Sequence, residues 1–138
     1  MAVLPVRDVD LHGRPSISLG ELDHLDDRSV APVATLLPAL DPTPMGWKQR
    51  ALFLGVDPAE VFDRAGNIGP TLWGDGEVIG SWAVTRSGDV RTTISADRGR
   101  KASRAVDEAA ARLLPRLQGA VVTPAARTLL EVLLSRRS

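Results

Sequence analysis

One stretch decides the fold of this chain, and it reads GNIGPTLWGDGEVIGSW over residues 66–82. Asp75 and Gly76 at its centre both tolerate positive φ, as the two residues of a type I′ hairpin turn require. A second turn signal, formed by Ser87 and Gly88, follows the middle strand. We therefore predict a three-stranded antiparallel meander at the centre of the fold, with strands near 70–74, 77–85 and 89–95.

The middle strand alternates two sets of side chains, and burial of the set that contains Trp82 would define its register. The nearby glycines, Gly74, Gly76 and Gly80, do not form a dinucleotide-binding fingerprint. They lie between two predicted strands, whereas a phosphate-binding loop leads from a strand into a helix N-terminus.

The composition is typical of one ordinary domain. The chain has 138 residues, 43% of them hydrophobic, and no cysteine, which excludes disulfides, thiolate metal sites and cysteine nucleophiles. The first residues show no signal-peptide pattern, and no apolar run approaches the length that crosses a membrane. We therefore expect a soluble, cytoplasmic protein without a membrane partner.

The charge of the chain is unevenly distributed although it sums to zero. Residues 97–138 contain nine basic and four acidic side chains, so this third has a net charge of +5 and the rest has −5. Two interpretations stay open, a surface that faces a polyanion and helix faces that are simply solvated.

The N-terminal residues predict a second hairpin over 3–19. A helical turn at 20–25 and a polar linker at 26–29 should follow it. We place the domain boundary at this linker, which divides the chain into 1–29 and 30–138. A buried strand is expected at 33–37, because Pro38 stops this apolar run.

Residues 40–44 read LDPTP and are expected to be irregular, because each proline disfavours the α region for the residue before it. Asp57 and Glu60 should form the capping box of a short helix. The last turn of this helix would contain Arg64, and Gly66 would end it in a left-handed conformation.

Two helices are expected in the C-terminal third. Over 100–114, apolar residues recur at three-to-four spacing until Pro115 ends or kinks the helix. Residues 121–122 would add an edge strand, and a last helix would cover 124–135.

No constellation of residues indicates catalysis. The only histidines, His12 and His24, lie in polar context without other soft ligands, so no metal site is predicted. Ser81 lies within a strand rather than at a strand-to-helix turn. Capping and turn roles account for the ordered acids Asp41, Asp57 and Asp63. We predict no catalytic residue and no cofactor.

Two tryptophans lead to different expectations. Trp82 is expected in the core, because its strand neighbours are apolar. Trp47 lies beside Lys48 after a proline-rich loop, and two roles stay open for it. It would either contact DNA or plug the end of a barrel.

Several segments resemble a known family. They are LLPALDP at 36–42, MGWK at 45–48 with Arg50, FDRAGNIGPT at 62–71, and GSW at 80–82. Their spacing is similar to that in the C-terminal part of the winged-helix DNA-binding-domain family that includes the AlkZ-like DNA glycosylases, which excise alkylated bases and unhook interstrand crosslinks. The resemblance covers roughly residues 3–135.

With the turn chemistry, this resemblance implies an α+β fold in which an antiparallel sheet curls into a partial β-barrel with two C-terminal helices. It also implies that the first thirty residues correspond to the end of a winged-helix unit. The catalytic motif of the glycosylases, usually two glutamines one residue apart, has no counterpart, since the only glutamines are Gln49 and Gln118. The chain would then be a truncated member, a fragment or an accessory domain.

The resemblance implies weak, non-specific binding of duplex DNA, with an N-terminal winged-helix portion or protein as a further partner. Phosphate contacts would come from the 45–50 loop and the tip of the meander. The predicted DNA-binding residues are Trp47, Lys48, Arg50, Arg64, Asn67, Arg86 and Arg91. The rival prediction is a non-catalytic structural or protein-interaction module, or a truncated gene remnant. In that case the basic residues would be solvated or paired with Asp63, Asp75, Glu77 and Asp89.

Overall fold

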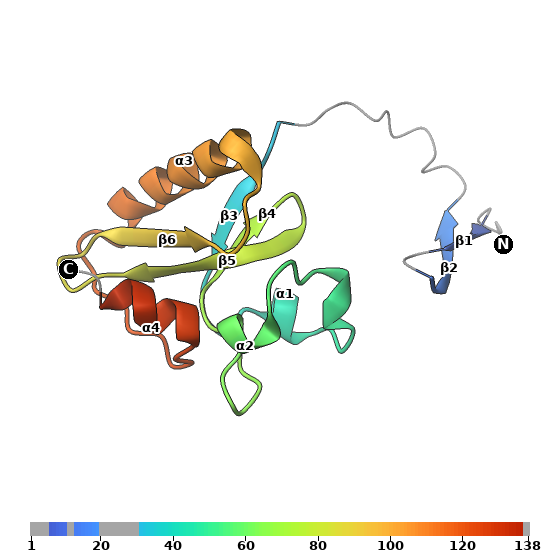
Figure 1. Ribbon diagram of the computed structural model, residues 1–138, viewed down its shortest axis with the longest axis horizontal. Helices are drawn as coiled ribbons and strands as arrows, with labels where there is room; N and C mark the ends of the chain where they lie inside the picture. Colours follow the sequence, from blue (N-terminus) through green and yellow to red (C-terminus); the bar gives the residue numbers. More distant parts are fainter. Residues whose placement is uncertain (1–5, 11–12, 20–30, 137–138) are drawn as a thin grey trace, which may run out of the picture. The chain divides into compact units, whose positions relative to one another are not determined.

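The computed structural model describes residues 6–10, 13–19 and 31–136 (Figure 1). The chain divides into two compact units, Met1–Ala31 and Pro32–Ser138. In the first unit, β1 (Val6–Asp10) and β2 (Pro15–Leu19) pair antiparallel. The predicted hairpin is confirmed for these residues. The helical turn and the linker predicted at 20–29 lie outside the described residues.

The second unit is built on a four-stranded antiparallel sheet with the order β3-β4-β5-β6. Asp75 and Gly76 join the second strand to the third with φ angles of 48° and 87°, as a type I′ turn requires. The predicted meander is therefore confirmed. The strands are β3 (Ala34–Leu37), β4 (Thr71–Gly74), β5 (Glu77–Val84) and β6 (Val90–Ile94).

Helices cover both faces of this sheet: α3 (Gly99–Leu117) lies over one face and α4 (Leu129–Ser135) over the other (Figure 1). Neighbouring residues of β5 show the arrangement. Ile79 packs in a cluster with Val106 of α3, whereas Val78 packs in a cluster with Leu130 of α4. Every residue of β5 after Glu77 is buried. The Trp82 face is therefore buried, as expected, and the opposite face is buried as well, because a helix covers each face.

Trp82 is buried, as expected. Its indole Nε1 donates a 2.8 Å hydrogen bond to the carbonyl of Leu37, so the polar edge of the ring is satisfied in the interior. This bond links β5 to β3, which are separated by β4 in the sheet. The described strands form an open sheet rather than a closed barrel, and its curling into a partial barrel stays a prediction.

The proline-rich segment corrects one prediction. Pro42–Met45 form a one-turn helix, α1, and are not irregular. Asp41 caps this helix by accepting a 2.9 Å hydrogen bond from the amide of Thr43. Pro42 and Pro44 both lie in the first turn, where N–H groups have no intrahelical acceptor, so the missing donors cost nothing.

The helix predicted after Asp57 is present but shorter. It is α2 (Pro58–Val61), and Asp57 caps it by accepting a 2.9 Å hydrogen bond from the amide of Ala59. Arg64 and Gly66 lie beyond its end, which corrects their predicted positions. Glu60 does not complete the expected capping box but accepts a 2.8 Å hydrogen bond from Ser95 Oγ.

The C-terminal helices also differ from their predicted bounds. α3 runs through Pro115 to Leu117, because a proline in the last turn removes a single helical hydrogen bond. Residues 121–122 form no strand, and the last helix begins at Leu129 rather than at 124. Thr128 is buried, and Gly69 leaves the space into which its side chain packs. The contact between Thr128 and Gly69 therefore outweighs the local sequence signal for a helix start at residue 124.

Candidate nucleic-acid interface

Four predicted DNA-binding residues occur around α1 and α2, and we call them the loop cluster: Trp47, Lys48, Arg50 and Arg64. Arg50 begins a short 3-10 helix, η2 (Arg50–Leu52), and the other three lie in loops. The guanidinium of Arg50 lies 3.9 Å from the centroid of the Phe62 ring. This cation–π contact holds Arg50 against the segment that leads to Arg64. Trp47 is 61% exposed, which contradicts a role in plugging the end of a barrel and leaves its ring free to contact a partner.

Asn67, a fifth predicted residue, is held by the protein itself. Its backbone and side-chain amides donate to the two carboxylate oxygens of Asp63, at 2.8 and 3.1 Å. The Ala65 amide donates to the same carboxylate at 2.9 Å. These hydrogen bonds, led by that of the Asn67 backbone, hold the pKa of Asp63 below its usual range. Asn67 therefore shapes this turn, and its side-chain donor group is engaged by Asp63.

Arg86 and Arg91 lie at the turn between β5 and β6, and we call them the hairpin-end pair. Arg86 follows β5 directly after Thr85, and Arg91 lies opposite Ala83. Both side chains are exposed. The turn between them is braced, because Ser87 Oγ donates a 2.8 Å hydrogen bond to Asp89.

The structure does not bring the loop cluster and the hairpin-end pair together. The segment that follows Arg50 lies along the start of β5, where the Val78 amide donates to the Phe53 carbonyl at 2.7 Å. Arg86 follows the other end of β5 (Figure 1). β5 has eight residues, so the two groups are separated by roughly 26 Å along the strand.

The acids predicted to neutralise these basic residues are engaged elsewhere. Glu77 forms an ion pair with Arg98 at 3.0 Å, and Asp75 accepts a 3.0 Å hydrogen bond from the Val33 amide. Within the part of the chain that the structure describes, no ion pair involves the exposed basic residues of the two groups. Those residues are Lys48, Arg64, Arg86 and Arg91.

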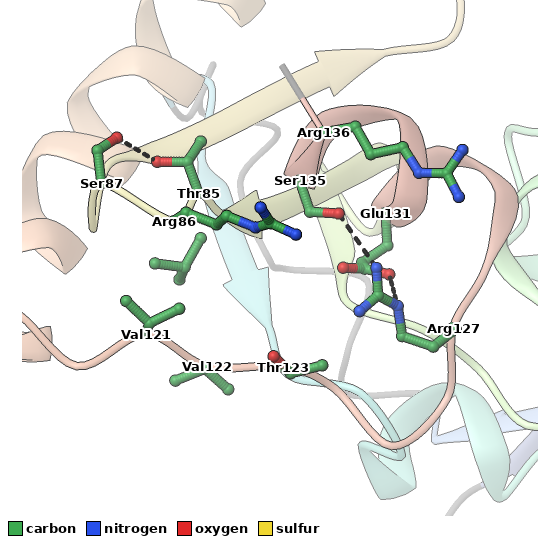
Figure 2. Close-up of a pocket in the computed structure, with 11 residues that line it drawn as sticks. Thr85, Arg86, Ser87, Val121, Val122, Thr123, Arg127, Glu131, Ser135 and Arg136 are labelled. Atoms are coloured by element: carbon green, nitrogen blue, oxygen red, sulfur yellow. Dashed lines mark hydrogen bonds and ion pairs between the residues drawn. The ribbon is translucent and has the colours of Figure 1, made fainter. Parts of the chain in front are cut away.

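A cleft of about 800 Å³, not predicted from the sequence, opens beside the β5–β6 turn (Figure 2). Arg86 lines it together with Arg127 and Arg136 from the C-terminal region, and we call it the arginine cleft. The segment 121–123 forms its opposite side. Arg86 is distant in sequence from the other two, which flank α4, so only the tertiary fold places all three around one cleft.

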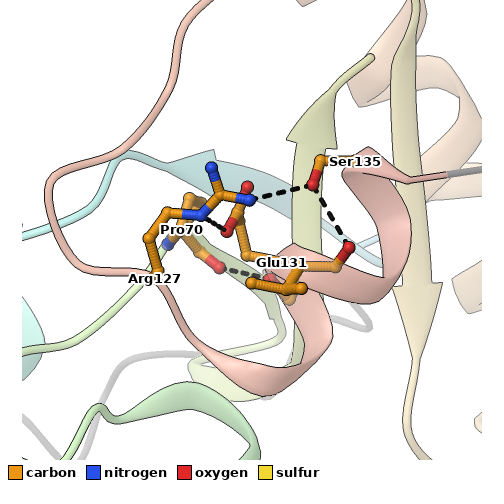
Figure 3. Close-up of polar contacts among 6 residues, drawn as sticks. Pro70, Arg127, Glu131 and Ser135 are labelled. Carbon is orange, nitrogen blue, oxygen red and sulfur yellow. Dashed lines mark hydrogen bonds and ion pairs between the residues drawn. The ribbon is translucent and has the colours of Figure 1, made fainter. Parts of the chain in front are cut away.

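Glu131 on α4 is the one buried carboxylate of this cleft, and 1% of its surface is exposed. Arg127 Nε lies 2.7 Å from Glu131 Oε2, and Arg127 Nη2 donates a 3.1 Å hydrogen bond to Ser135 Oγ (Figure 3). Burial raises the pKa of Glu131, while the charge of Arg127 and the hydroxyl of Ser135 oppose the rise. The i,i+4 spacing of these three residues was a local signal that the sequence analysis did not use.

A smaller, mostly apolar cavity of about 240 Å³ adjoins the arginine cleft. Its lining includes Pro38, Leu40, Trp82 and Pro124. The two cavities share Val84, Val122 and Thr123, so they adjoin, and we call the two together the groove. This groove has a charged end and an apolar end.

Residues 2–116 match the family of AlkZ-like DNA glycosylases. The chain belongs to this family. Among solved structures it is similar to the DNA glycosylase AlkZ of Streptomyces sahachiroi, with a TM-score of 0.52 and 23% sequence identity. No curated protein matches the chain.

The similarity to AlkZ covers 86% of this chain and 32% of AlkZ, so the chain spans about a third of the length of that glycosylase. The loop cluster and the hairpin-end pair lie within the part that matches the AlkZ-like family. Arg127, Glu131 and Arg136 follow the last matched residue. The arginine cleft is thus built partly outside the segment that defines membership.

Two further features of the described residues concern metal binding and membrane crossing. Among residues 6–10, 13–19 and 31–136, no group of three or more His, Asp or Glu side chains could hold a metal ion. The two histidines of this AlkZ-like chain lie outside those ranges. No helix among the described residues is both long and apolar enough to cross a membrane.

Proposed function

We propose that this chain is a DNA-contacting part of an AlkZ-like DNA glycosylase. Membership of the family supports DNA as the partner. The observation that carries the proposal is the exposure of Lys48, Arg64, Arg86 and Arg91, with no acidic partner among the described residues. Exposed basic side chains are ligands for phosphate groups.

Binding through these residues is electrostatic and independent of sequence. Base readout requires polar side chains aimed at base edges, and the Asn67 side chain is oriented by a hydrogen bond from its Nδ2 to Asp63. Four phosphate contacts give a dissociation constant on the order of 10⁻⁴ to 10⁻⁶ M at physiological salt. Such a part assists recognition of a lesion by holding the duplex.

The binding experiment is a fluorescence-anisotropy titration of duplex DNA at low salt. We expect Arg86→Ala/Arg91→Ala and Lys48→Ala/Arg64→Ala each to weaken binding by about tenfold and to reduce the slope of log K against log salt by about 1 to 2. Arg50 is left intact because it stacks on Phe62, so its loss would disturb the fold.

The matched control is Arg100→Ala/Arg112→Ala, which removes two exposed arginines from α3. This variant has the same net charge as the test variants. A difference in affinity between them therefore reflects where the basic residues lie and not the total charge. Equal loss in all three double variants would contradict the site assignment. The single variant Arg136→Ala is titrated as well. If only this variant binds duplex DNA more weakly than the parent, the site assignment is also contradicted.

The chain itself carries no base-excising group in this proposal. The paired glutamines of the glycosylases have no counterpart in the sequence, and excision requires a group that stabilises the developing charge on the sugar or positions water. We expect no release of methylated purine from alkylated duplex DNA above a control without protein, measured by chromatography of the released base. Release above that control would contradict the proposal.

The remaining assignments extend the same proposal. Residues 1–29 correspond to the end of a winged-helix unit, and residues 30–138 form the DNA-contacting domain with a sheet that curls into a partial barrel. An N-terminal winged-helix portion, or a separate protein that carries one, supplies the catalytic glutamines. The site of action is the DNA of the cytoplasm.

A second candidate function is a non-catalytic interaction module. The exposed apolar residues beside the groove favour it, since Val121 and Val122 are 53% and 48% exposed. An upstream reading frame that encodes winged helices with a paired-glutamine motif would favour the first candidate.

A further inference from the structure

The segment 120–124 has the composition of a strand but no strand partner. It reads AVVTP, and Val121 and Val122 are β-branched residues that favour extended backbone. The structure assigns no regular secondary structure to it. Among the described residues, the amides and carbonyls of residues 121–123 form no backbone hydrogen bond. Unpaired backbone groups in a segment of this composition can pair with the backbone of another chain.

The groove beside this segment offers binding sites for side chains of an added strand. The apolar cavity of about 240 Å³ lies at one end and is lined by Leu40, Trp82 and Pro124. A polar base edge would find few hydrogen-bond partners there, because most lining residues are apolar and the Trp82 Nε1 donor is already bound to Leu37. The cavity therefore suits an aliphatic or aromatic side chain better than a nucleobase.

The other end of the groove favours negatively charged groups of a partner. Arg86 and Arg136 are exposed at the arginine cleft, and Arg127 is held by Glu131 (Figure 2). Arg86 has no ion-pair partner in the described part of the chain, and neither does Arg136. Their guanidinium groups form bidentate hydrogen bonds with carboxylates. This end therefore complements an acidic segment.

We propose that the groove binds an extended peptide segment of a partner protein, with an apolar side chain in the small cavity and acidic side chains at Arg86 and Arg136. The backbone of the peptide pairs with residues 121–123, as in strand addition to a free sheet edge. This interaction goes beyond the DNA contacts proposed above and does not depend on them.

The probe is a fluorescein-labelled peptide in which a Leu-Val-Leu segment is followed by two aspartates, titrated with the full chain. We expect Arg86→Ala/Arg136→Ala to weaken binding by at least about fivefold. Exchange of the two aspartates for lysines should abolish binding. Val121→Pro and Val122→Pro each remove one backbone donor, and since successive amides of a strand point to opposite sides, one of the two should weaken binding by about fivefold.

Amide NMR supplies a second readout, in which the Val121 and Val122 signals should shift on addition of the peptide. The proline variants keep every charge, so their affinity for duplex DNA should equal that of the parent, which separates this proposal from the proposed function. The proposal is overturned if neither proline variant weakens peptide binding, if the lysine peptide binds equally well, or if an oligothymidylate binds the groove while the acidic peptide does not. Failure of duplex binding with normal peptide binding would overturn the DNA proposal alone.

Discussion

Replacement of Gly80 by alanine is expected to lower the free energy of unfolding by about 3 kcal/mol. Gly80 lies on β5 opposite Ile94 of β6, and a Cβ atom there would overlap the backbone carbonyl of Thr93. A flexible side chain could move away, but the Thr93 carbonyl is part of the sheet backbone. β5 and the edge strand β6 must therefore separate or shift. Urea unfolding followed by circular dichroism measures the loss.

The matched control for this prediction is Gly88→Ala in the β5–β6 turn. Gly88 has a φ of 88°, and nothing lies within 4 Å of a Cβ built there. Gly88→Ala should therefore lower the free energy of unfolding by only about 1 kcal/mol, from left-handed backbone strain. If Gly80→Ala and Gly88→Ala lower the free energy of unfolding equally, the close approach of β6 is not the reason why position 80 requires glycine.

Arg127→Ala is expected to destabilise the fold by about 2 to 3 kcal/mol at neutral pH and by much less at acidic pH. The change leaves Glu131 buried without its ion pair. This loss is smaller than the roughly 3 to 5 kcal/mol typical of a broken buried ion pair, because the Arg127 side chain is 43% exposed. Thermal or urea unfolding of parent and variant across pH measures the difference.

The pH dependence follows from the direction of the Glu131 shift. Burial raises the pKa of Glu131 above the 4.5 of an ordinary glutamate, so the folded state holds its proton to higher pH than the unfolded state does. The stability from this group is complete below the unfolded pKa and is lost as pH rises through the folded pKa. The charge of Arg127 lowers the pKa of Glu131, and the Arg127→Ala variant lacks this interaction. The variant is therefore less stable than the parent above pH 4.5.

The parent loses stability in acid for a separate reason, because the pKa of Asp63 is lowered in the fold. Its contribution is present above the unfolded pKa and is lost as pH falls through the folded pKa. Comparison of parent and variant at the same pH cancels this contribution. The Arg127→Ala/Glu131→Gln double variant should recover most of the stability at neutral pH.

A matched control for burial exists on α3. Arg104 and Glu108 have the same i,i+4 spacing and lie 2.9 Å apart, but their side chains are 82% and 53% exposed. Arg104→Ala should cost less than about 0.5 kcal/mol, without the same dependence on pH. An equal cost for Arg104→Ala and Arg127→Ala would show that burial of Glu131 is not the source of the effect.

The sequence by itself determined the elements whose signals are local. Asp75 and Gly76 define the β4–β5 hairpin because a type I′ turn requires positive φ at both positions. Asp57 caps the predicted helix, since a short carboxylate accepts a hydrogen bond from an amide two residues on. Asp63 organises the following turn in the same way. In each case the interacting groups are within a few residues of one another.

Only the tertiary structure decided the features that depend on distant segments. α4 begins at Leu129 because Thr128 packs into the space left by Gly69. β5 is buried on both faces because α3 and α4 cover it from opposite sides. The arginine cleft exists because the β5–β6 turn meets the C-terminal helix, which brings Arg86 to Arg127 and Arg136. Periodicity and capping report which face or end of an element is apolar or charged, but they do not encode which distant element it meets, and that partner is chosen by packing of the whole chain.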